Sequence, residues 1–266
     1  MLIPISLAQG LLGALFQILY WAGKVSPFWS QLGWLMITQG VFLCLVMGIG
    51  GFLGPRLLGH QLFRIEGGRP ITQMTPGNFR IAAHALAGLL LFASFVLEAL
   101  GLRVIGYGLR AIVVTGEILW TTKIYKLPSN KDTYVKLFWI SFWMIILGLW
   151  TQVLWPSYRM AALHLVFIGG FSLMTFTIAT MVTLSHLGYG ALLKKPLWVV
   201  SLFGAMLLAA MIVRSSADFH PRLYFHFLAA ASVFWMIAAG GWLLFIIPKF
   251  FQAPKSLRQP AGSLHA

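Results

Sequence analysis

The sequence predicts an all-α fold, a polytopic transmembrane helix bundle with about eight spans, and three observations support this prediction. Of the 266 residues, 59% are hydrophobic and only 9% are charged, whereas a soluble globular chain carries about 25% charged residues. Apolar stretches long enough to cross the hydrocarbon core of a bilayer recur along the chain. The basic residues gather in alternate connections between these stretches. The lipid bilayer is therefore the first partner expected.

Each expected span is an apolar stretch of roughly the length that a helix needs to cross the bilayer. The first has no basic segment before it and no clear small-residue cleavage site, so we expect a retained helix and no signal peptide. The polar connection 54–78 is too short to be a separate domain. The spans are expected near 3–22, 29–53, 79–100, 103–124, 134–155, 160–188, 197–213 and 222–247. We expect a single membrane domain, residues 1–250, followed by a cytoplasmic tail, residues 251–266.

The formal charge of +14 is a topology signal. Thirteen basic residues fall on one side of an eight-span arrangement: Arg56, Arg64, Arg69, Arg80, Lys123, Lys126, Lys131, Lys136, Lys194, Lys195, Lys249, Lys255 and Arg258. Five fall on the other side: Lys24, Arg103, Arg159, Arg214 and Arg222. The positive-inside rule then predicts a multi-pass protein of the bacterial inner (cytoplasmic) membrane with both termini in the cytoplasm. This distribution also argues against nucleic acid as a partner.

Cysteine and glycine usage excludes several kinds of site. Cys44 is the single cysteine, so the chain can form no intrachain disulfide. It also offers no CxxCH haem attachment and no CxxC metal site, so any haem would be non-covalent. The 27 glycines are scattered and form no nucleotide-binding loop.

Within the sixth expected span, the stretch 164–188 starts and almost ends with histidine. His164 and His186 are 186 − 164 = 22 positions apart, which is roughly 33 Å of α-helix. At about 100° per residue, the two rings would point the same way, one near each membrane face. This spacing predicts two polar groups at the two ends of one transmembrane helix.

The other histidines match these two in expected depth. His84, in the third span, should lie near the depth of His186. His226, in the eighth span, should lie near the depth of His164, with His220 in the connection just before it. Imidazole ligates haem iron and copper, so His84, His164, His186, His226 and His220 are the expected metal or cofactor ligands. The alternative is that these rings only meet the membrane interface.

Three further ionisable residues lie inside the expected spans, namely Glu98, Arg110 and Glu117. Intramembrane ionisable groups are rare and are usually functional. The two glutamates are candidates for a proton path, and Arg110 for a partner of a haem propionate. The plainer alternative is a protonated glutamate bonded to a neighbouring helix and an arginine that reaches the interface. No residue is assigned a catalytic role.

The stretch from His164 to Gly188 resembles the signature helix of the NnrS family, membrane proteins of nitric-oxide metabolism and nitrosative-stress resistance. The family pattern is matched at the same offsets by His164, Gly169, Met174, Thr175, Leu184, His186 and Gly188. The last span, with the run LAAASVFWMIAAGGWLLFIIPKF, and the stretch GIGGFLGPRLLG are similar to further parts of the family. The resemblance implies a helical membrane protein that binds haem b and copper.

The sequence also departs from the family pattern. NnrS proteins as a rule have about twelve spans, against about eight here. The family's early Trp-His-x-His-Glu-Met motif corresponds to LMITQG, in which Met36, Thr38 and Gln39 replace the two histidines and the glutamate. Met181 replaces an arginine of the signature helix. The loss of the early histidines weakens the expectation of copper more than that of haem.

The resemblance predicts a short NnrS-like protein in nitric-oxide stress resistance or nitrogen-oxide respiration, with nitric oxide or an electron donor such as quinol as partners. Two alternatives stay open. A haem-free transporter or channel would use the same polar residues as a substrate or proton path, although no inverted repeat is evident. A small quinol-linked dihaem b-type cytochrome would also use histidines at two depths. The sequence does not say whether the protein is an enzyme.

Overall fold

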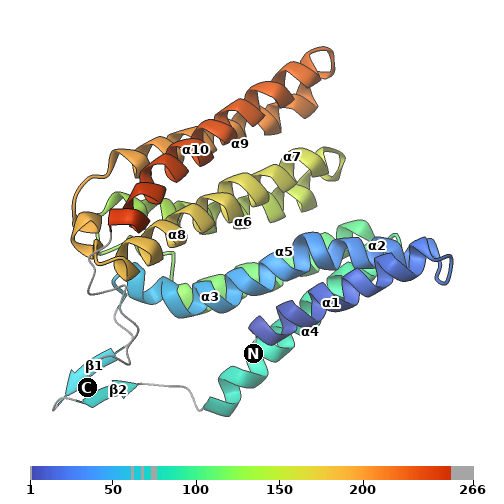
Figure 1. The fold of residues 1–266 in the computed structure, drawn as a ribbon. Helices are drawn as coiled ribbons and strands as arrows, with labels where there is room; N and C mark the ends of the chain where they lie inside the picture. The colour runs from blue at the N-terminus through green and yellow to red at the C-terminus, as the bar shows by residue number, and fades with distance from the viewer. Residues whose placement is uncertain (1, 61–62, 67–68, 73–76, 253–266) are drawn as a thin grey trace, which may run out of the picture. The chain divides into compact units, whose positions relative to one another are not determined.

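The computed structural model describes residues 2–60, 63–66, 69–72 and 77–252. Eight helical segments in this part of the chain are long and apolar enough to cross a membrane, which confirms the all-α, eight-span prediction (Figure 1). They are Leu2–Trp21, Pro27–Leu57, Phe79–Ala99, Arg103–Thr122, Thr133–Leu154, Pro156–His186, Trp198–Phe219 and Pro221–Gln252. The predicted cytoplasmic tail lies outside the described residues from position 253 onward.

Some of these segments contain more than one helical element. The α-helices are α1 (Leu2–Trp21), α2 (Pro27–Leu35), α3 (Val41–Leu57), α4 (Gly77–Ala99), α5 (Arg103–Thr122), α6 (Thr133–Leu154), α7 (Arg159–His164), α8 (Leu173–His186), α9 (Trp198–Ser216) and α10 (Tyr224–Gln252). Proline stands at the first turn of α2, where its missing N–H costs no hydrogen bond. Gly101 and Gly188, with φ of 87° and 79°, follow the ends of α4 and α8 in the left-handed region that glycine favours.

A short antiparallel hairpin lies in the connection between α3 and α4. Strand β1 (Phe63–Glu66) pairs with β2 (Arg69–Thr72), in the register that sets Phe63 opposite Thr72. The sequence analysis treats this segment only as a polar connection and misses the hairpin. Two four-residue strands bury too little surface to form a domain, so the hairpin leaves the fold class unchanged.

The described chain divides into two compact units, and each is described by itself. The first comprises residues 1–129 and 149–159, and the second comprises residues 130–148 and 160–266. Because α6 contributes to both units, the boundary falls within a helix. The expectation of a single membrane domain stays a prediction.

Close glycine contacts hold the helices of the first unit together. A Cβ added at Gly13 on α1 would lie 2.8 Å from the carbonyl oxygen of Gly33 on α2, and one at Gly33 would lie 2.7 Å from that of Gly13. On α5, a Cβ at Gly106 would lie 2.7 Å from the Ser94 carbonyl oxygen of α4. Small residues thus let these backbones approach closely, as is typical of transmembrane helix packing.

The second unit packs α9 against α10, α8 and the first part of α6. Its apolar core includes Leu173, Phe203, Leu207 and Ala238, which are fully buried. Polar contacts also join helices of this unit; for example, the Trp242 indole donates to the Thr180 hydroxyl at 2.8 Å.

Two spans contain π-helical segments, Met36–Gly40 between α2 and α3 and Leu165–Ser172 between α7 and α8. A π-helix closes i→i+5 hydrogen bonds and therefore turns through less than 100° per residue. The prediction that the His164 and His186 rings point the same way assumes regular α-helix throughout. Eight π-helical residues between the two rings remove that assumption, so the shared direction is not supported.

Candidate functional site

The buried ionisable groups of the first unit form two clusters. We call one the His84 pocket, built from α1, α3, α4 and α5 around His84 and Glu117. We call the other the Arg110 cluster, built around Arg110 and Glu98. Arg110 and Glu117 lie on the same helix, seven positions apart, which is roughly 10 Å along its axis.

In the His84 pocket, an imidazole is paired with a carboxylate from the neighbouring helix. Nδ1 of His84, on α4, lies 2.5 Å from Oε1 of Glu117, on α5. The Glu117 side chain is buried, and that of His84 is 25% exposed. With Glu117 as a carboxylate, which accepts hydrogen bonds, Nδ1 of a neutral His84 carries the proton in this pair, and the lone pair of Nε2 is then available. Among the described residues, no hydrogen-bond partner is found for Nε2.

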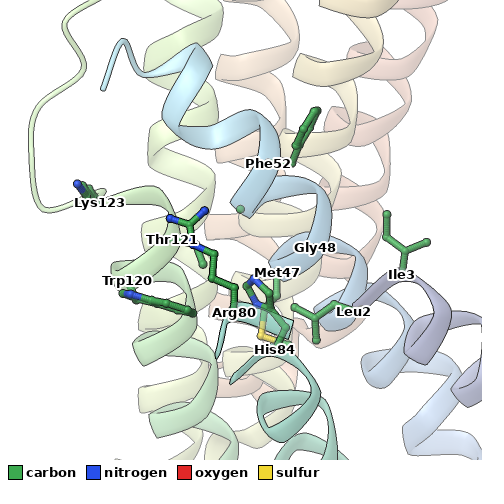
Figure 2. A pocket seen from close by; sticks show the side chains of 11 residues that line it. Leu2, Ile3, Met47, Gly48, Phe52, Arg80, His84, Trp120, Thr121 and Lys123 are labelled. Atoms are coloured by element: carbon green, nitrogen blue, oxygen red, sulfur yellow. The ribbon is translucent and has the colours of Figure 1, made fainter. Parts of the chain in front are cut away.

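His84 lines a pocket of about 400 Å³ (Figure 2). This volume falls within the range of small-molecule sites. Trp120 packs near the imidazole, with 5.6 Å between the ring centroids. The other lining residues are Leu2, Ile3, Met47, Gly48, Gly51, Phe52, Arg80, Thr121 and Lys123. The pocket therefore combines apolar walls, two cationic side chains and one imidazole.

This arrangement suits a metal ligand. A histidine that binds a metal usually donates its other ring N–H to a carboxylate, which sets the tautomer and raises the basicity of the ligating nitrogen. Glu117 occupies that position for His84. Two glycines on the α3 wall, Gly48 and Gly51, carry no side chain that would fill the pocket. The cationic groups of Arg80 and Lys123 provide charge for an anionic substituent of a bound group.

In the Arg110 cluster, a fully buried guanidinium is surrounded by acceptors. Nη2 of Arg110 lies 2.5 Å from Oε2 of Glu98, Nη1 donates to Oε1 of Gln39 at 2.6 Å, and Nε donates to Oγ of Ser94 at 3.3 Å. The Phe95 ring lies 4.4 Å from the guanidinium carbon. Burial of this charge is therefore compensated by an ion pair, two further hydrogen bonds and an aromatic ring.

Glu98 joins a second arginine to this cluster. Its Oε1 accepts from Nη2 of Arg159 at 2.9 Å, while its Oε2 accepts from Arg110. Glu98 is therefore bonded to a neighbouring helix, as the plainer alternative expects, and its partners are two arginines. The alternative of an arginine that reaches the interface is wrong for Arg110, which is 0% exposed. Its role as a propionate partner stays a prediction.

Sequence reasoning misses several members of the two clusters. It places Arg80, Lys123 and Arg159 only as topology markers, and it does not predict that Gln39 contacts Arg110. One signal was available, because Gln39 stands where the family motif has a glutamate, which is also an acceptor. The contact depends on which helix faces match, and one sequence does not determine this.

The remaining predicted histidines belong to the second unit, so the predicted pair of His84 and His186 spans both units and stays a prediction. His186, the last residue of α8, is exposed. His164 is half-buried, with Nδ1 2.6 Å from the Met160 carbonyl oxygen of the preceding turn.

His220 and His226 also lie at the surface of the second unit. The Nδ1 atom of His220 lies 3.0 Å from the Ser216 carbonyl oxygen, and its ring stacks on Phe227. Within the described part of the chain, no group of three or more His, Cys, Asp or Glu side chains is arranged to hold a metal ion. A metal site formed by the described residues would thus use fewer than three of these side chains, or other donor groups.

Comparisons with known proteins agree with the family resemblance. The NnrS protein family matches residues 1–253, which is nearly the whole chain. No curated protein and no solved structure matches the chain. The match covers the predicted signature span and both clusters of the first unit. This membrane protein belongs to the NnrS family.

Proposed function

We infer that the protein is a haem b protein of the bacterial inner membrane that acts in nitric-oxide stress resistance or nitrogen-oxide respiration. The observation that carries this proposal is the hydrogen bond from His84 to Glu117 at the wall of a 400 Å³ pocket. Membership of the NnrS family supports the link to nitric oxide.

The residues of the His84 pocket fit a haem group. His84 would hold the iron through Nε2, Trp120 and Phe52 would supply apolar contacts to the group, and Arg80 and Lys123 would neutralise its propionates. A bound haem supplies an iron that binds nitric oxide and exchanges electrons. Glu117 keeps the proton of His84 on Nδ1 and thereby holds Nε2 ready as a ligand.

The proposed topology gives this pocket a location. Basic residues are concentrated around the connection between α3 and α4 and around that between α5 and α6. This excess favours the cytoplasm for the side of the membrane on which these two connections lie. Arg80 and Lys123 are among these residues, so the pocket would open near the cytoplasmic face. The Arg110 cluster would then lie nearer the opposite face, because Arg103 begins α5.

A pyridine haemochrome assay on the detergent-solubilised protein, purified from haem-replete cells, tests this proposal. We expect a non-covalent haem b signal and, in the reduced protein, a shift of the visible spectrum when nitric oxide is added. A folded but colourless protein would reject the haem proposal in favour of the haem-free transporter or channel. Haem without a nitric-oxide response would leave the quinol-linked cytochrome.

A further inference from the structure

We propose that a second pocket of the first unit, at the Arg103 end of α5, binds a small oxyanion. This pocket has a volume of about 190 Å³, and we call it the Arg103 pocket. It is lined by Gln31, Trp34, Glu98, Arg103, Tyr107 and Arg159, among others. It is separate from the His84 pocket, with which it shares no lining residue, and the proposal does not rest on haem.

The charges at this pocket are predominantly positive. Arg103 and Arg159 line the pocket, and Arg110 forms an ion pair with Glu98, which also lines it. Against these three arginines stands one carboxylate, so the local balance is 3 − 1 = two positive charges. Both oxygens of Glu98 already accept from arginines, one from Arg110 and one from Arg159. The carboxylate therefore neutralises only part of the cluster, and the remaining positive charge favours an anion.

Three donors at the pocket lack a partner among the described residues. The Nε atom of Arg159 is buried and forms no hydrogen bond. Tyr107 is only 3% exposed, and its hydroxyl forms no hydrogen bond with the described chain. Arg103, at the rim, forms no ion pair with a described residue. Of these three donors, Nε of Arg159 is a buried group without a partner, which is rare in folded proteins, whereas Arg103 is exposed. An oxyanion in the pocket would accept hydrogen bonds from these donors.

The shape of the donors indicates the class of ligand. A guanidinium presents N–H groups in a planar fork that matches an anion with two oxygens, and a phenol hydroxyl adds a third donor. The pocket volume suits a group of a few heavy atoms, such as a planar monovalent oxyanion or the phosphate of a lipid headgroup. Trp34, 46% exposed at the rim, covers one side without adding charge. Because Arg103 begins the 20-residue helix α5, the positive end of this helix adds to the attraction.

Thermal unfolding of the full-length protein in detergent tests the proposal, with nitrate as the probe. Nitrate replaces chloride in the buffer, so that the ionic strength stays constant. We expect nitrate to raise the unfolding temperature of the wild type in a saturable way. In Arg103→Gln and in Tyr107→Phe, we expect the affinity for nitrate to fall about tenfold, as for the loss of one charged or charge-assisted hydrogen bond. The matched control is Arg222→Gln, an exposed arginine of the second unit, which should bind nitrate like the wild type.

A second measurement distinguishes a free anion from a lipid headgroup. The same proteins are placed in nanodiscs of phosphatidylcholine with and without phosphatidylglycerol. If phosphatidylglycerol stabilises the wild type but not Arg103→Gln, and removes the response to nitrate, the ligand is the headgroup of an anionic lipid. If nitrate acts equally in both nanodiscs, the ligand is a free oxyanion. If neither nitrate nor phosphatidylglycerol stabilises the protein in an Arg103-dependent way, the proposal is wrong.

Discussion

Glu98 and Glu117 show how differently two buried carboxylates can be held. Glu98 lies between two arginines and forms a charged cluster, whereas Glu117 forms a hydrogen bond to an imidazole beside a pocket. Composition predicts that both residues are special, because acidic residues are rare in spans. It does not predict their partners, because a partner depends on the rotation of each helix about its axis. The sequence places His84 and Glu117 on successive spans, and only the structure shows that they face each other.

At the residue scale, Glu98→Gln should be strongly destabilising. It leaves the guanidinium of Arg110 buried without its counter-charge, and breaking such a buried pair costs about 3–5 kcal/mol of the free energy of unfolding. SDS titration of the protein in detergent micelles measures this loss.

The double variant Glu98→Gln/Arg110→Gln is the control for this interpretation. It removes both charges, so it should lose less stability than the sum of the two single variants. Additive losses would mean that the two side chains do not interact as the structure shows.

Glu117→Gln should affect the haem ligand rather than the fold. Glutamine can still accept from Nδ1 of His84, but it carries no negative charge and makes the ligating nitrogen less basic. If His84 ligates haem, we expect the variant to keep haem but to bind it roughly 10–100-fold more weakly. Haem titration of the apoprotein measures this affinity. The control is Thr122→Ser, on the same helix but outside the pocket lining. Unchanged affinity in Glu117→Gln would remove Glu117 from the proposed site.

At the scale of the elements, periodicity and charge predict the helices well. All eight expected spans are present, and most of their ends lie within a few residues of the observed ones, as for 103–124 against Arg103–Thr122. The larger differences occur at the ends of the seventh and eighth spans; the eighth is expected to end at 247, whereas α10 continues to Gln252. The seventh span is expected to end at 213 but continues to Phe219 through a 3-10 turn. Neither π-helical segment is predictable, because a one-residue widening of the helix leaves no pattern in an apolar run.

The contact between α4 and α5 depends on a glycine, and this gives a prediction for the element scale. A Cβ at Gly106 would lie 2.7 Å from the carbonyl oxygen of Ser94 and 3.0 Å from the amide nitrogen of Glu98. Both atoms belong to the backbone and cannot move aside easily. Gly106→Ala should therefore lower the free energy of unfolding by about 1–3 kcal/mol in the same SDS titration.

Gly108, two residues later on α5, is the matched control. A Cβ at this position would meet no atom within 4 Å, so Gly108→Ala should be neutral or stabilising by about 0.5–1 kcal/mol through the lower backbone entropy of the unfolded chain. If Gly106→Ala had as little effect on the free energy of unfolding as Gly108→Ala, α4 and α5 would not approach each other as closely as described.

At the scale of the whole molecule, orientation in the membrane is the main prediction. The split of thirteen basic residues against five predicts that both termini face the cytoplasm. Reporter fusions at residue 266 and in the connection between α9 and α10 should give cytoplasmic and periplasmic signals, respectively. A periplasmic C-terminus would overturn the depth assigned to each histidine.

Copper content is a second prediction for the whole protein. Met36, Thr38 and Gln39 replace the two histidines and the glutamate of the family's early motif, and Gln39 contacts Arg110. We therefore expect less than one copper ion per chain by elemental analysis. A full copper equivalent would show that other residues replace the early histidines.

The most direct test of the proposed haem site is the visible spectrum of the purified protein, oxidised and then reduced, for the wild type, His84→Ala and His60→Ala. His60 is a suitable control because it belongs to the same unit, its ring nitrogens lie near the backbone carbonyl oxygens of Thr122 and Leu127, and it does not line the His84 pocket. We predict b-type spectra for the wild type and His60→Ala, and the loss of at least one haem component in His84→Ala. A full wild-type spectrum in folded His84→Ala protein, at an unchanged protein level, would contradict His84 as a haem ligand.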